Sequence, residues 1–157
     1  MAYHNELPSN AKDVLVFKPE NQATLRRAVS TAYYSIFHLL IFDSCQLWGS
    51  PEHRYNLSRQ FDHSLMKTAS RLICDNKFKP PGSPSEMSLV IVAANFVQLQ
   101  RKRNECDYDL SFTMSFTEAD RHVDLAQAAF DEWAKIRTEQ IAKDYLYSLL
   151  FRENKRA

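Results

Sequence analysis

Residues 25–40 read LRRAVSTAYYSIFHLL, and this stretch decides the fold class of the chain. Its apolar residues recur at steps of three and four, namely Leu25, Val29, Ala32, Ile36 and Leu39. This spacing predicts an α-helix with one buried stripe, and a second apolar stripe runs beside the first. The helix, expected over residues 22–47, therefore either lies at the centre of a bundle or shares one face with a second subunit.

The composition of the chain favours a single all-α domain. Its 157 residues are enough to bury a core, and its 45% apolar and 25% charged residues are close to the globular average. The two glycines are too few for Gly-rich phosphate loops or for many tight hairpins, and neither the P-loop nor the dinucleotide-binding motif is present. We therefore expect one domain over residues 1–157, with its core at about 20–135.

Charge and cysteine content limit the classes of function. A net charge of +1 excludes a protein coated in positive charge, so any nucleic-acid-binding surface must be a local patch. The three cysteines form no C-x-x-C pair, which favours buried reduced thiols over a disulfide framework. The most apolar stretch is much shorter than the ~20 residues of a bilayer span, and no secretory signal is recognised at the start. These features predict a cytoplasmic protein without membrane contact.

Three further helices are expected along the chain. The second spans residues 57–75, and the third begins after Pro84. The last follows a capping box formed by Ser115 and Glu118, or by Thr117 and Asp120, and reaches about residue 151. Residues 109–116 alternate weakly in polarity but have no partner strand, and residues 7–18 suggest one more short helix. Short connections between long amphipathic helices predict a four- to five-helix up-and-down bundle.

Residues 101–109, RKRNECDYD, combine basic and acidic side chains at the expected end of the third helix. Arg101 and Glu105 are four residues apart, as are Arg103 and Asp107, so each pair lies on one helix face. Such exposed pairs contribute only about 0.2–0.5 kcal/mol each. On spacing alone, this segment is a charged helix end that pairs with itself.

Two groups of residues have a structural and a functional interpretation. The aromatic cluster Tyr33, Tyr34 and Phe37 would suit base stacking, but aromatic residues at helical spacing more often form core. His38 is expected to be a partly buried, hydrogen-bonded histidine. No metal site or cofactor is expected, because the histidines form no HxxxH or HExxH pair and the acidic residues are scattered.

Three segments, in this order, resemble the HEPN superfamily, the nucleotide-binding helical domains of higher eukaryotes and prokaryotes. Residues 25–40 resemble its signature first helix, and FDHSLMKTASRL at 61–72 resembles an intervening helix in which a His-Ser pair is common. LQRKRNECDYD at 99–109 resembles the later motif of one bacterial branch, an arginine followed by Asp-Tyr-Asp. The resemblance implies a HEPN-like four- or five-helix bundle that forms a homodimer, with the two motif helices around one cleft.

The resemblance also implies chemistry. Many HEPN proteins are metal-independent endoribonucleases of toxin–antitoxin, phage-defence and CRISPR systems, and their motif is an arginine, four to six residues, and a histidine. The arginine would hold the scissile phosphate while the histidine assists attack by the ribose 2′-hydroxyl, which leaves a cyclic phosphate. Here Tyr108 occupies the earliest histidine position after Arg103. A tyrosine, with an ordinary pKa near ~10, is a poor general base at neutral pH.

Two functions follow from this resemblance. The favoured one is a binding or regulatory module that recognises RNA or a nucleotide, or that serves as the HEPN half of a two-component system, of toxin–antitoxin or phage-defence type, with a nucleotidyltransferase partner. The alternative is a metal-independent endoribonuclease with an atypical Arg/Tyr active site. The candidate catalytic residues are Arg103, Asn104, Tyr108, His38 and His63. The candidate RNA- or nucleotide-contacting residues are Arg26, Arg27, Tyr34, Arg101, Lys102 and Arg103.

Overall fold

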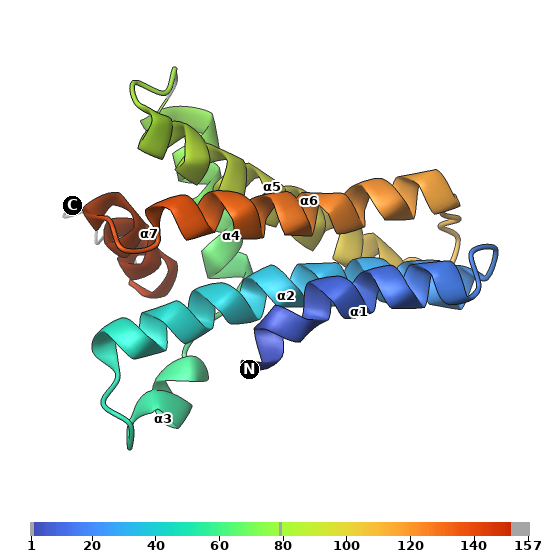
Figure 1. The fold of residues 1–157 in the computed structure, drawn as a ribbon, viewed down its shortest axis with the longest axis horizontal. Helices are drawn as coiled ribbons and strands as arrows, with labels where there is room; N and C mark the ends of the chain where they lie inside the picture. Colours follow the sequence, from blue (N-terminus) through green and yellow to red (C-terminus); the bar gives the residue numbers. More distant parts are fainter. Residues whose placement is uncertain (1, 79, 152–157) are drawn as a thin grey trace.

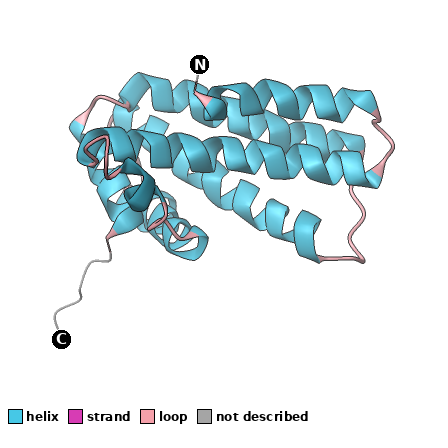
Figure 2. Ribbon diagram, turned by 90° about the horizontal axis from the view of Figure 1, so that it is seen from below, coloured by secondary structure: helices cyan, strands magenta, loops and turns pink. Residues whose placement is uncertain are grey.

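The computed structural model describes residues 2–78 and 80–151, and all regular structure in them is helical (Figure 1, Figure 2). The elements in chain order are α1 (Tyr3–Phe17), α2 (Gln22–Trp48), α3 (Arg54–Ser58), α4 (His63–Leu72), the π-helical turn η1 (Ile73–Lys77), α5 (Pro84–Tyr108), α6 (Phe116–Ile136) and α7 (Gln140–Leu150). The all-α prediction is confirmed. The described residues form seven α-helices, more than the four to five predicted.

Helix α2 lies at the centre of the molecule. Asn21 caps its first turn by accepting a hydrogen bond from the Thr24 amide at 3.1 Å. Helices α1, α2 and α6 run side by side along the long axis, and α5 crosses them obliquely (Figure 1). Because α1 covers one side of α2 while α5 and α6 cover the other, both apolar stripes of α2 are buried within one chain.

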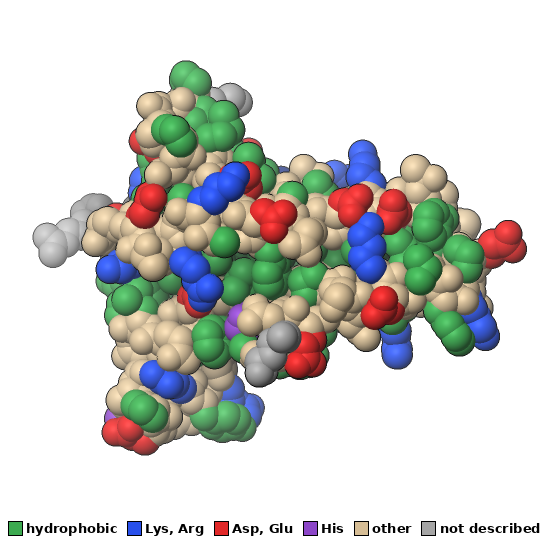
Figure 3. Space-filling model, viewed as in Figure 1, with side chains coloured by type: hydrophobic (Ala, Val, Ile, Leu, Met, Phe, Trp, Pro, Cys, Tyr) green, Lys and Arg blue, Asp and Glu red, His purple; other side chains and the backbone are tan. Residues whose placement is uncertain are grey.

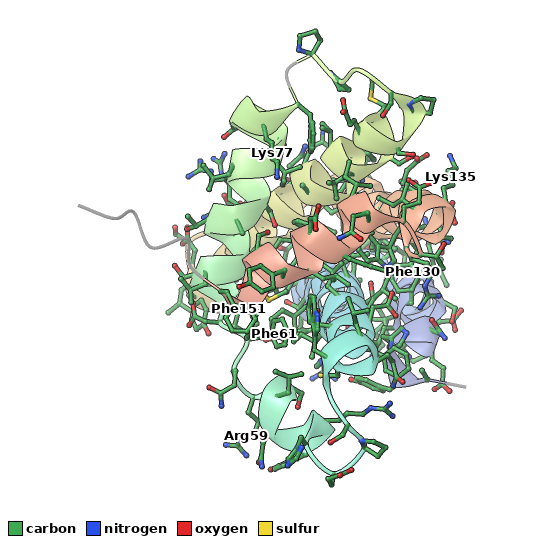
Figure 4. The ribbon with its side chains drawn as sticks, turned by 90° about the vertical axis from the view of Figure 1, so that its left-hand side faces the viewer. Arg59, Phe61, Lys77, Phe130, Lys135 and Phe151 are labelled. Atoms are coloured by element: carbon green, nitrogen blue, oxygen red, sulfur yellow. The ribbon has the colours of Figure 1, made fainter. Side chains whose placement is uncertain are left out.

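The region expected to form one helix over residues 57–75 is divided. A short arm, α3, ends at Ser58, and a new helix begins at His63 because the Asp62 carboxylate accepts the amides of Ser64 and Leu65, each at 2.9 Å. Figure 4 shows Arg59 on the α3 arm and Phe61 closer to the bundle, where its side chain is buried. The division matters for the site, because it places His63 in the first turn of α4.

The expected last helix is interrupted at residues 137–139, which separate α6 from α7. The turn lets α7 fold back onto α4 and bury its apolar face. There the Tyr145 hydroxyl lies 2.8 Å from the Ser70 hydroxyl, and the Tyr145 ring packs edge-on to Trp133 at 6.1 Å between centroids. A continuous helix would have exposed this face to water, so burial of apolar surface accounts for the break.

Residues 109–115, between α5 and α6, are held in an irregular conformation and form no strand. The Gln22 side chain bonds both backbone groups of Met114, donating to its carbonyl at 2.7 Å and accepting from its amide at 2.9 Å. Ser115 then caps α6 by accepting from the Glu118 amide at 3.1 Å, as the predicted capping box requires. The connection is therefore fixed to the start of α2.

The molecular surface carries charges of both signs. Figure 3 shows Lys and Arg side chains intermixed with Asp and Glu side chains over one face.

None of the helices in the described part of the chain is both long and apolar enough to cross a bilayer.

The Asp43 carboxylate joins α2 to the end of α6. It accepts a hydrogen bond from the Trp133 indole at 2.7 Å and one from the Arg137 guanidinium at 2.5 Å. We expect Asp43→Ala to lower the free energy of unfolding by about 1–3 kcal/mol, because the buried indole N–H loses its acceptor. Urea denaturation followed by circular dichroism measures this change.

The matched control is Lys135→Ala, which breaks an exposed ion pair with Glu132 on the same helix. This change should alter stability by at most about 0.5 kcal/mol. An Asp43→Ala protein as stable as the Lys135→Ala protein would show that the indole contact contributes little.

Candidate functional site

Arg103 lies on the inner face of α5 and is 5% exposed. Its guanidinium carbon is 5.0 Å from the ring centroid of Tyr33 and 5.5 Å from that of Tyr34, both on α2. A guanidinium at this distance is attracted by the electron-rich ring faces. The two adjacent tyrosines of α2 therefore hold a buried cation between the central helix and α5.

The hydrogen-bonding capacity of Arg103 is not fully used. Its Nη1 is 3.7 Å from the Asp107 carboxylate, and the other oxygen of that carboxylate accepts the Ser30 hydroxyl at 2.6 Å. Within residues 2–78 and 80–151, the buried Nε of Arg103 has no hydrogen-bond partner. An unpaired buried donor is costly, and an oxyanion is the acceptor that best fits a guanidinium.

His63 brings α4 to the same cluster. Its Nδ1 lies 2.6 Å from the Tyr33 hydroxyl, and its ring stacks on Phe37 with centroids 4.2 Å apart and planes 17° apart. The Gln100 side chain of α5 donates to the His63 carbonyl at 2.6 Å. Three helices therefore fix the position of one imidazole.

The charge states of this cluster follow from burial and from Arg103. Burial lowers the pKa of His63, the Arg103 and His38 charges lower it further, and Asp62 opposes them. Burial raises the pKa of Tyr33, against the effect of the Arg103 charge. At neutral pH the histidine is therefore neutral and the tyrosine protonated.

Tyr34 and His38 form the half-buried outer part of the cluster. Their ring centroids are 6.0 Å apart, and the exposed Tyr3 of α1 packs edge-on to His38 at 5.5 Å. Burial lowers the pKa of His38, so this ring is also neutral near pH 7. The structure thus brings together four of the predicted site residues, namely Arg103, Tyr34, His38 and His63.

Asn104 and Tyr108 lie elsewhere on α5. At 3.6 residues per turn they are about 100° and about 140° from Arg103 around the helix axis. Both are exposed, and the Tyr108 side chain is 74% accessible. The structure therefore separates these two predicted catalytic residues from Arg103 and places His63 beside it instead.

Arg26 holds the end of α5. Its guanidinium donates to the carbonyls of Cys106 at 3.0 Å and Asp109 at 2.8 Å, and also to the carbonyl of Phe112. Carbonyls in the last turn of a helix have no partner within the helix, so a cation beside them is stabilising. The donors of this predicted ligand-binding residue are engaged with the backbone.

Lys102 is engaged in a similar way. Its ammonium bonds Glu105 at 2.6 Å and Glu118 at 2.8 Å, and it lies 4.7 Å from the Phe112 ring centroid. The Arg101 side chain is 79% exposed and lies 3.5 Å from Glu105, and Arg27 is exposed on α2. The two ion pairs expected from the spacing, Arg101–Glu105 and Arg103–Asp107, are both formed. Of the two arginines, only Arg103 is buried.

From the sequence, Tyr33 is interpreted only as core or as part of a base-stacking cluster, and Gln100 is assigned no role. Phe96, Gln100 and Arg103 are spaced by four and three residues, so two polar side chains continue the buried stripe of α5. A polar residue on an apolar stripe needs a buried partner, and this was the signal that could have linked Gln100 and Arg103. The hydroxyl of a tyrosine at a core position carries the same requirement.

The fold and the site define an all-α helical-bundle protein with a buried arginine–tyrosine–histidine cluster. No family model, curated protein or solved structure matches the chain. Within the described residues, no three His, Cys, Asp or Glu side chains gather in a way that would hold a metal ion.

Removal of the Arg26 side chain should loosen the connection between α5 and α6. We expect Arg26→Ala to lower the free energy of unfolding by about 1.5–3 kcal/mol, because carbonyls of the α5 end lose a charged donor. Backbone amides of residues 109–115 should then exchange with deuterium faster than in the wild type. Arg27→Ala, which removes the exposed neighbouring arginine, should change neither quantity; equal effects of the two variants would contradict the role given to Arg26.

Proposed function

We propose that this protein is a HEPN-like RNA- or nucleotide-binding or regulatory module, and that Arg103 contacts a phosphate of its ligand. The observation that carries this proposal is the buried guanidinium held against Tyr33 and Tyr34, with its Nε unpaired within the described residues. The fork of an arginine matches the oxygens of a phosphate better than a lysine does.

The surroundings of Arg103 suit a ligand that carries both phosphate and rings. Tyr34 and His38 lie half-buried at the outer part of the cluster, and Tyr3 is exposed beside them. Aromatic side chains next to a cation are the usual means of holding single-stranded nucleic acid, because bases stack on the rings while the cation contacts the backbone. With a net charge of only +1, recognition would depend on this local site.

A second candidate function is metal-independent endoribonuclease activity. The specific observation in its favour is that α4 places His63 beside Arg103, although no histidine follows Arg103 at the expected spacing. In that mechanism the arginine would stabilise charge on the phosphate and the histidine would move a proton. Tyr108 and Asn104 would have no direct part in it.

The wider assembly belongs to the same proposal. The resemblance to HEPN proteins supports a homodimer and a place in a toxin–antitoxin or phage-defence two-component system with a nucleotidyltransferase partner. The second apolar stripe of α2 does not add to this support, since it is buried within one chain, where Tyr33 packs on Phe96 of α5 and Phe37 stacks on His63 of α4. The homodimer therefore rests on the resemblance alone.

The binding proposal is tested with fluorescently labelled single-stranded and structured RNA in EDTA. We expect Arg103→Ala to weaken binding at least about tenfold, because a hydrogen bond to a charged group contributes about 1.5–3 kcal/mol. Arg101→Ala removes the same charge two residues away, from an exposed side chain, and should have a smaller effect. Binding should also weaken as salt is added.

Three controls complete this experiment. Circular dichroism and thermal unfolding establish that both variants fold, and Arg103→Lys replaces Ala if the alanine variant does not. Equal affinity of the Arg103 and Arg101 variants would refute the assignment of Arg103. Cleavage that persists in EDTA and disappears with Arg103 would establish the second candidate function in place of the first.

The homodimer is tested by sedimentation at tens of micromolar protein. We expect a mass of twice the 18.3 kDa of one chain. A monomer at this concentration would contradict a cleft built from two copies of α5.

A further inference from the structure

We propose that His63 acts as a neutral hydrogen-bond donor that presents Nε2–H to a bound oxyanion beside Arg103, and that Tyr33 is the positioning residue that fixes this tautomer. The inference rests on the proposed phosphate binding and deepens it. It assigns the imidazole to recognition of a phosphate oxygen, which is a different role from that of a catalytic base.

The first step is the hydrogen bond between the Tyr33 hydroxyl and His63 Nδ1, which are 2.6 Å apart. Only two arrangements are compatible with a neutral imidazole. Either Nδ1–H donates to the tyrosine oxygen, or the tyrosine donates to a bare Nδ1 and the ring proton resides on Nε2. The direction of this one bond therefore decides which nitrogen of His63 carries a proton.

The second step is the influence of Arg103 on the direction of the hydrogen bond between Tyr33 and His63. Its guanidinium lies over the Tyr33 ring, and its positive charge acts on the tyrosine oxygen, where it favours the ionised form. A cation attracts the lone pairs of a nearby hydroxyl and repels its proton, so the O–H bond points away from Arg103. Burial keeps Tyr33 protonated, so its proton remains available for Nδ1.

The third step is the fixed orientation of the imidazole. The ring stacks on Phe37, and the Gln100 side chain bonds the carbonyl of the same residue at 2.6 Å. With Nδ1 occupied by the buried Tyr33 hydroxyl, Nε2 is the ring nitrogen left free of that bond, on a half-buried ring. The site then offers two kinds of donor, a cation and a neutral N–H, and both are complementary to an oxyanion.

This arrangement opposes the role of a general base. A base must offer a lone pair to the proton that it removes, and in this tautomer the outward nitrogen already carries a proton. The bare Nδ1 is occupied by Tyr33. The geometry therefore favours binding of a phosphodiester over its cleavage.

Protonation of His63 would strengthen the contact between its Nε2–H and a bound phosphate. The charged or titratable groups that face the ring are Tyr33, Tyr34 and His38 of α2, Asp62 at the start of α4, and Arg103 of α5. A bound phosphodiester adds negative charge and so raises the pKa of His63 relative to the free protein. By linkage, affinity increases as the pH falls through the pKa of the complex and levels off below the pKa of the free protein.

The tautomer is tested directly by nitrogen NMR on the full chain labelled with ¹⁵N-histidine. At pH 7.5 we expect the His63 signals of an unprotonated Nδ1 and a protonated Nε2. Tyr33→Phe removes the donor and should abolish this preference. A protonated Nδ1 in the wild-type protein would overturn the inference, and this measurement requires no variant to fold.

Binding is tested with a short oligouridylate that has no terminal phosphate, because its phosphodiesters do not titrate between pH 5.5 and 8. The wild type should bind several-fold more tightly at pH 5.5 than at pH 8, up to the limit of about tenfold that a rise of about one pKa unit on binding allows. His63→Gln keeps an N–H donor and should bind as the wild type does at pH 8, without the gain in acid. His63→Ala should bind weakly at both pH values.

The matched control is His53→Gln, which changes an exposed histidine on the segment before α3 and should retain the full pH dependence. Absence of oligouridylate binding by the wild type at either pH would refute binding of single-stranded RNA at Arg103, and the inference with it. Binding that is independent of pH, or equal binding by His63→Gln and His63→Ala, would overturn the inference and leave the proposed function standing. Cleavage of RNA in EDTA that His63→Gln abolishes would also overturn it, in favour of a catalytic base.

Discussion

The burial of α2 on nearly all sides is the constraint on which the rest of the structure depends. A helix of 27 residues with two apolar stripes must be covered along most of its length, and α1, α5 and α6 supply that cover. Because α5 has to pack on α2, the stripe that continues through Gln100 and Arg103 is brought against Tyr33 and Tyr34. The polar cluster is thus a direct result of the packing of the apolar core.

The cluster also shows how a low-polarity environment controls proton positions. Tyr33 and His63 lie in or near the core, so burial keeps both groups uncharged at neutral pH. Arg103 remains charged, because a guanidinium does not lose its proton in proteins. The charge of Arg103 orients the dipoles of the Tyr33 hydroxyl and the His63 imidazole, a role that water would fill at the surface. The site is therefore organised before any ligand arrives.

The sequence was most informative where the determining interactions are local. The apolar spacing of residues 25–40 predicted a helix over 22–47, and the structure has it at Gln22–Trp48. The capping box predicted the start of α6, and the end of α5 at Tyr108 falls within the charged motif. The breaks before His63 and after Ile136 were not predicted. The first is set locally by the Asp62 cap, and the second depends on how α7 packs on α4.

The site shows the same limit. The spacing placed Arg103 and Asp107 on one helix face, and the HEPN resemblance selected Arg103 among the basic residues. Neither could show that His63, which is 40 residues earlier in the chain, lies beside it, since that proximity arises only from the crossing of α2, α4 and α5. The order of residues along α5 also drew attention to Tyr108, although helix geometry directs it away from Arg103.

The attachment of Arg26 to the end of α5 has a consequence for the order of folding. This residue bonds backbone groups 80 to 86 positions later in the chain, whereas α1 and α2 are neighbours joined by a short connection. Contacts close in sequence form faster than distant ones, so the hairpin of α1 and α2 can assemble first. During synthesis, the α2 half of the cluster would therefore emerge from the ribosome well before its arginine. The arginine–tyrosine–histidine cluster is then complete only once α5 has been synthesised, and no early folding intermediate would contain it.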